Sequence, residues 1–154
     1  MVIALGGDHR GTSAIKTLAE KLKREGHEAV MLGDCSGASV DYPEPAYHVG
    51  KYVAEGRAKF GILICGTGIG VSIAANKVHG VRAAVVHDEL TAQLARSHND
   101  ANVLCMSGDL LGQRLIEKIA EVFVRAEFEG GRHQRRIDKI TAIENGKDPS
   151  VMPG

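Results

Sequence analysis

The sequence has no excess of charge of either sign, since 19 lysines and arginines balance 19 aspartates and glutamates in 154 residues. A neutral chain lacks the basic surface that attracts nucleic acids and anionic membranes, so we expect neither as a partner. No apolar run reaches the 18 residues that a bilayer span needs, and Met1 leads into VIAL without a basic leader. We therefore expect a cytoplasmic protein without a membrane segment.

Cysteine is scarce, with only Cys35, Cys65 and Cys105, an odd number without metal-ligand spacing. This usage suits a reducing compartment better than a disulfide framework. Hydrophobic residues make up 44% of the chain and charged residues 25%, as in ordinary soluble proteins. The length predicts one domain with a buried core.

Short apolar runs alternate with amphipathic stretches along the chain. The runs predict strands at 2–7, 27–33, 60–65, 81–86 and 101–106. The amphipathic stretches predict helices at 12–26, 46–55, 70–78, 88–98, 110–127 and 134–144. Strands that alternate with helices are typical of an α/β fold, in which helices cover both faces of a parallel sheet.

Local signals set some boundaries of these elements. Thr12 or Ser13 can cap the first helix, and Gly26 can end it. The DYPEP segment, 41–45, reads as a break before the second helix. We predict one domain over 1–145, followed by a loose C-terminal tail over 146–154.

Ligands of parallel α/β sheets bind beyond the carboxyl ends of the strands, so candidate site residues lie just after each strand. Asp8 and His9 follow the first strand. They are candidate site residues, and the alternative is a helix-capping aspartate beside a surface histidine.

The third strand ends in Cys65, and glycines follow at 66, 68 and 70. A dinucleotide fingerprint needs glycine at position 71, where Val71 stands, and no Walker lysine follows, so neither a nicotinamide cofactor nor ATP is expected. The loop instead predicts a run of backbone N–H groups that bind a negatively charged oxygen. Such a field favours the ionised form of a neighbouring thiol, and Thr67 can hydrogen-bond the sulfur or the ligand. The alternative, a buried cysteine that closes a strand, fits Cys35 and Cys105 better.

Two further groups stand later in the chain. His98, Asn99 and Asp100 follow the fourth helix; they are either a helix end or a second set of site residues, which we expect at the same sheet edge as Cys65. Arg132 and Arg136 are four residues apart and so share a helical face. Two guanidinium groups there can clamp a phosphate, and the alternative is a solvated basic helix end.

The segments GDHRG, DYP, ILICGTGIGVSIAANK, AQLARSHNDANVL and FEGGRHQRRIDKI resemble the ribose-5-phosphate isomerase B family over residues 2–143. That family includes allose-6-phosphate isomerase and the galactose-6-phosphate isomerase subunits. The resemblance implies a three-layer α/β/α sandwich with a five-stranded parallel, Rossmann-like sheet. It also implies a homodimer whose active sites draw on both subunits, without metal or nucleotide.

The resemblance further implies aldose–ketose isomerisation of a sugar phosphate through a cis-enediolate. Cys65 would be the base, with Thr67 orienting the thiol. His98 would open the sugar ring, and Asp8 would hold or relay hydroxyl protons. The remaining implied contacts are the enediolate-binding loop (Gly66, Gly68, Ile69, Gly70), the sugar contacts (Tyr42, Asn99) and the phosphate contacts (His9, Arg132, Arg136).

Two positions depart from the family pattern. Asp109 stands where many members carry a basic phosphate contact, and Thr12 replaces a large apolar residue. Asp109 would weaken phosphate binding unless it faces solvent or pairs with an arginine such as Arg114. Another pentose or hexose phosphate, a free sugar, or a non-catalytic binding role therefore stay open as alternatives.

Overall fold

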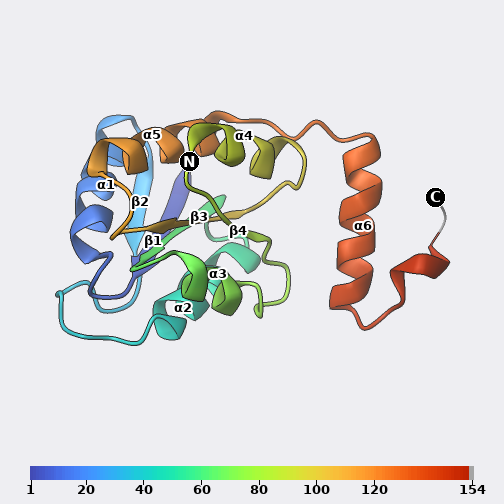
Figure 1. Ribbon diagram of the computed structural model, residues 1–154, viewed down its shortest axis with the longest axis horizontal. Coiled ribbons are helices and arrows are strands. Elements are labelled where there is room, and N and C mark those ends of the chain that lie inside the picture. The colour runs from blue at the N-terminus through green and yellow to red at the C-terminus, as the bar shows by residue number, and fades with distance from the viewer. Residues whose placement is uncertain (153–154) are drawn as a thin grey trace.

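A five-stranded parallel sheet forms the centre of the computed structural model, which describes residues 1–152 (Figure 1). Its strand order is β2-β1-β3-β5-β4, and every neighbouring pair is parallel. The strands are β1 (Val2–Gly7), β2 (Glu28–Met31), β3 (Phe60–Cys65), β4 (Ala83–Val85) and β5 (Val103–Ser107). The predicted parallel α/β sheet is confirmed, with somewhat shorter β2, β4 and β5.

Helices cover both faces of the sheet, as Figure 1 shows. One layer holds α1 (Thr12–Arg24), α4 (Glu89–Ser97) and α5 (Gln113–Arg125), and the other holds α2 (Pro43–Ala54) and α3 (Ile69–Ala75). Along β3, Ile62 and Ile64 pack with the first layer, whereas Leu63 and Cys65 pack with the second. Burial on both faces explains why β1, β3 and β5 read as continuous apolar runs.

Some predicted boundaries differ from the structure. Gly11 precedes α1 without a side-chain cap, and the Thr12 hydroxyl donates to the Asp8 carbonyl at 3.1 Å, so neither predicted cap operates. Helix α2 begins at Pro43, inside the predicted break, because proline fits the first helical turn, where its missing N–H has no intrahelical partner.

Helix α6 (Arg132–Glu144) stands beside the layered body at the end of an irregular linker, residues 126–131 (Figure 1). Its C-terminal end is fastened to the body, since the Gly80 amide donates to Glu144 Oε1 at 2.7 Å. A 3₁₀ turn, η1 (Pro149–Val151), lies within the predicted tail, whose residues 153–154 fall outside the described part. The domain boundary at residue 145 stays a prediction.

The strand order places a topological switch point between β1 and β3. These neighbours are followed by helices on opposite faces of the sheet, α1 in one layer and α3 in the other. Ligands of such folds bind at this switch point, outside the carboxyl ends of the strands. Within residues 1–152, no helix has both the length and the apolar composition needed to cross a bilayer.

Candidate active site

The loop after β3 is held against the loop after β5 at the carboxyl edge of the sheet. The Gly108 amide donates to the Cys65 carbonyl at 2.8 Å, and the Asp109 amide donates to the Gly66 carbonyl at 3.2 Å. The Ser107 hydroxyl also donates to the Gly66 carbonyl, at 2.5 Å. These bonds fix the backbone on both sides of the thiol.

Cys65 is 4% exposed, and its sulfur accepts a hydrogen bond from the Gly68 amide at 3.2 Å. Gly68 has a φ of 79°, in the left-handed region, and this conformation turns the chain into α3. The Thr67 hydroxyl accepts from the Ile69 amide at 3.2 Å. Within the described chain, the sulfur is therefore contacted by a backbone N–H. Of the two expected partners of Thr67, the sulfur is not bonded to it here, and a bond to the ligand stays a prediction.

The three loop glycines let neighbouring parts of the chain approach the loop backbone closely. A Cβ at Gly66 would lie 3.1 Å from Asp109 Oδ2, and one at Gly68 would lie 2.9 Å from the Met106 backbone. A Cβ at Gly70 would lie 2.7 Å from the Tyr42 ring. The glycines thus bring Tyr42 and the loop after β5 into contact with the thiol loop.

Asp109 pairs with Arg10, across 99 positions of sequence. Arg10 Nε and Nη2 lie 2.8 Å and 2.6 Å from Asp109 Oδ2, and Asp109 raises the pKa of Arg10 through this hydrogen bond and its charge. Of the two sequence alternatives for Asp109, pairing with an arginine is the one found, although the partner is not Arg114. Arg10 is not predictable from the sequence alone, because it becomes a candidate only once β1 and β5 are known to flank β3.

Asp8 and His9 lie at the same edge, directly after β1. Asp8 is 7% exposed, and its Oδ1 accepts from the Arg10 amide at 2.9 Å. His9 is exposed. We call Asp8, His9, Tyr42 and residues 65–70 the carboxyl-edge group.

His98 and Asn99 lie at the opposite edge of the sheet, so the expectation that they share an edge with Cys65 is wrong. Helix α4 ends next to the start of β5, where the Asn102 carbonyl accepts from the Gly61 amide at the start of β3. Cys65 stands four residues further along β3, roughly 13 Å away at the usual strand rise. The physical reason is that a helix following a parallel strand returns the chain to the edge where strands begin.

Basic side chains gather around His98 at this amino edge. The His98 and His133 rings stack, with centroids 4.2 Å apart and planes 10° apart. Arg132 and Arg136, both exposed, flank His133 on α6. Burial lowers the pKa of His133, and the nearby positive groups add to this effect. We call His98, Asn99, Arg132 and Arg136 the amino-edge group; sequence analysis did not single out His133.

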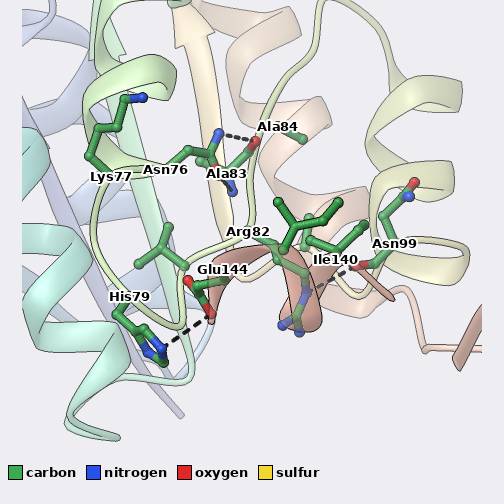
Figure 2. A pocket seen from close by; sticks show the side chains of 12 residues that line it. Asn76, Lys77, His79, Arg82, Ala83, Ala84, Asn99, Ile140 and Glu144 are labelled. Atoms are coloured by element: carbon green, nitrogen blue, oxygen red, sulfur yellow. Dashed lines mark hydrogen bonds and ion pairs between the residues drawn. The ribbon is translucent and has the colours of Figure 1, made fainter. Parts of the chain in front are cut away.

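Asn99 also lines a cavity of about 610 Å³ between α6 and the β4 side of the body. Figure 2 shows Asn99 and Ile140 on the same side of this cavity, with Glu144 and His79 paired on another. Much of the lining is aliphatic, from Val81, Ala83, Ala84, Ala101, Ile140 and Ile143. The cavity is thus distinct from the Cys65 loop.

The loop geometry predicts unequal tolerance of its glycines. Gly68→Ala should lower the free energy of unfolding by about 2 kcal/mol, because alanine is strained at this φ. Its Cβ would also press on the β5 backbone. Gly70→Ala is the matched control; it should change stability by less than about 1 kcal/mol, because the half-exposed Tyr42 ring can move and alanine favours a helix. Urea denaturation measures both, and equal losses would contradict the prediction.

Comparisons with known proteins agree with the fold and identify the family. The family model described as Ribose/Galactose Isomerase matches residues 3–140. Ribose-5-phosphate isomerase B of Escherichia coli (strain K12) is 44% identical over 146 residues, which cover 95% of this chain and 98% of that protein.

Two solved structures have the same fold. Ribose-5-phosphate isomerase B of Clostridium thermocellum superposes with a TM-score of 0.93 at 43% identity, covering 95% of this chain and 99% of that one. The Mycoplasma genitalium enzyme, solved with bound ribulose-5-phosphate, has a TM-score of 0.90 at 47% identity and covers 94% and 96%. The chain belongs to the ribose/galactose isomerase family and is an aldose–ketose isomerase.

Proposed function

We propose that this enzyme interconverts ribose 5-phosphate and ribulose 5-phosphate, with Cys65 as the base. The observation that carries the proposal is the thiol at the β1–β3 switch point, with the Gly68 amide pointing at its sulfur. The pentose phosphate is the substrate named for the similar Escherichia coli enzyme and the ligand in the Mycoplasma genitalium structure. A free thiolate base requires a reducing compartment, which suits a cytoplasmic enzyme.

In this mechanism the Cys65 thiolate removes the proton from C2 of the open-chain aldose and forms a cis-enediolate. The thiol exchanges part of this proton with solvent and delivers a proton to C1, while a hydroxyl proton moves from O2 to O1, which leaves the ketose. Backbone amides of residues 66–70 stabilise the negative oxygen that develops between the two carbons. Asp8, buried at the same edge, would hold the hydroxyl protons, and Tyr42, beside Gly70, would contact the sugar.

The remaining groups come from a second copy of the chain. His98 is the proposed acid–base group for ring opening, and Asn99, Arg132 and Arg136 are proposed sugar and phosphate contacts. All four lie at the edge remote from Cys65 of their own chain. A two-fold dimer that places each amino-edge group over the other carboxyl-edge group would complete two equal sites.

Exposed aliphatic side chains favour this dimer. Ile69 and Ile73 on α3 are 53% and 58% exposed, and Ile140 and Ile143 on α6 are 43% and 59% exposed. The α6 pair also borders the cavity of Figure 2. Exposed aliphatic side chains of this kind are typical of a surface that contacts another protein. For α3 and α6, the proposed partner is a second copy of the chain.

Arg10 is the proposed phosphate contact that offsets Asp109. Both bonds from Arg10 go to one carboxylate oxygen, so Nη1 and one Nη2 hydrogen are free to reach an anion in the geometry described. The side chain is 56% exposed and lies against Gly66, next to Cys65. Asp109 would then orient this guanidinium, and the carboxylate charge would be neutralised before the phosphate binds.

The assignment of Cys65 is tested by Cys65→Ala. Its kcat for ribose 5-phosphate should fall by about a thousandfold or more, with little change in KM, because a base acts in the transition state. Cys35→Ala, at the partly exposed cysteine, is the control and should keep full activity. In deuterated water, the wild-type enzyme should exchange deuterium into C2 of ribose 5-phosphate, and Cys65→Ala should not. If the wild-type protein exchanges no deuterium, it is either a binding protein or an enzyme that acts on another sugar.

Shared sites predict complementation between two inactive variants. Cys65→Ala and His98→Ala homodimers should each be inactive on ribose 5-phosphate, but mixing them after unfolding and refolding should give about a quarter of the wild-type rate. Half of the dimers are then mixed, and each mixed dimer has one intact site. A mixture no more active than its components would place both residues in one chain's site, contrary to the proposed dimer.

The role of Arg10 predicts a pattern in three variants. Arg10→Ala should raise KM about tenfold at low salt with kcat little changed, whereas Asp109→Asn should lower KM because the positive charge is released. The double variant should keep the high KM. If the double variant instead had the wild-type KM, the only role of Arg10 would be to neutralise Asp109, and Arg10 would not contact the phosphate. Arg114→Ala, at an exposed arginine, is the control and should change nothing.

A further inference from the structure

Three metal-ligating side chains meet where α4, the linker and α6 come together. His98 Nε2 lies 3.9 Å from Glu129 Oε2, and His133 Nε2 lies 3.6 Å from the same oxygen. The three ligand atoms all lie within 4.8 Å of one another. Of these three side chains, only His98 has a role in the proposed reaction.

The His133 side chain supplies a second, independent sign of a ligand. It is 6% exposed, and its Nε2 has no hydrogen-bond partner among the described residues. A buried polar atom without a partner is unfavourable, and such atoms are rare in folded proteins. This nitrogen points into the cluster, where a cation would satisfy its lone pair.

We propose that His98, Glu129 and His133 bind a borderline divalent cation such as Zn²⁺ as an inhibitor of the enzyme. Two imidazoles and one carboxylate are a common ligand set for Zn²⁺, with water completing the tetrahedron. Ligand atoms around tetrahedral zinc lie about 3.4 Å apart, so the two N···O separations need to shorten by only a few tenths of an ångström.

The surroundings allow this rearrangement. The two rings are stacked nearly parallel, so the His98 ring must tilt for both nitrogens to face one ion. His98 is 37% exposed and Glu129 is 59% exposed, which leaves both side chains free to adjust around the buried His133. The Glu129 amide donates to the Ser97 carbonyl at 3.0 Å and keeps the carboxylate beside the rings.

The ion would act by occupying His98. A metal-bound imidazole nitrogen cannot exchange protons with the sugar ring, so ring opening would stop. The bound ion would also join the linker to the end of α4. This link would fix the start of α6 and the positions of Arg132 and Arg136. Inhibition rests on the proposed role of His98, whereas binding of the ion does not.

Binding is tested with Co²⁺, a spectroscopic substitute for Zn²⁺, added to the reduced, full-length Cys65→Ser protein. We expect one Co²⁺ per chain, visible bands of a low-coordinate site, and no thiolate charge-transfer band. Glu129→Gln and His133→Gln should each weaken binding by about tenfold or more, since even loss of a residue that only supports a ligand has that effect. In the enzyme with Cys65 intact, Zn²⁺ should inhibit reversibly with EDTA, and Glu129→Gln should relieve the inhibition.

His79→Gln is the matched control. His79 is an exposed histidine that contacts Glu144 at 3.8 Å but has no second imidazole, so Co²⁺ binding should not change. Glu129 is on the surface, so its variant tests the site even if His133→Gln fails to fold. Unchanged affinity in Glu129→Gln, or no Co²⁺ bound at stoichiometric concentration, would overturn the site. Tight binding without inhibition would keep the site and refute the role of His98.

Discussion

Parallel strand pairing is the constraint on which the rest of this structure depends. Each strand must start at the same edge of the sheet, so every helix carries the chain back across the layer. Residues that follow strands therefore gather at one edge, and residues that follow helices gather at the other. Cys65 follows β3 and His98 follows α4, so the two proposed acid–base groups of one chain are kept apart. The chemistry proposed for this enzyme needs two chains for that reason.

The thiol is held in place chiefly by backbone contacts. The Gly68 amide contacts the sulfur, and the carbonyls of Cys65 and Gly66 accept bonds from the loop after β5. Backbone groups on a packed sheet have little freedom to move, so the loop is organised before a substrate arrives. The Arg10–Asp109 pair lies beside this loop, and Arg10 neutralises the negative charge that the sequence alone suggests there.

Much of the fold follows from local sequence. The apolar run at 60–65 ends in glycines and forms β3 as predicted, and the apolar face of the first helix packs in the core. The edge of the sheet on which His98 lies also follows from the strand–helix alternation, but only if the direction of each helix is considered. The Arg10–Asp109 pair could not be predicted, because it depends on the strand order and joins residues far apart in the chain. The stacking of His133 on His98 is equally nonlocal, since the linker must first bring α6 beside α4.

Helix α6 is joined to the layered body by the linker, by the stacking of His133 on His98 near its start, and by a few contacts near its C-terminal end. In the proposed dimer this arm carries the two phosphate-binding arginines to the other chain's thiol. The rate per chain would then depend on protein concentration, because a dissociated chain keeps its fold and its nucleophile but has no group to open the sugar ring. Dilution would therefore inactivate such an enzyme by dissociating the dimer, without unfolding the chains. Substrate that contacts both chains would oppose this dissociation.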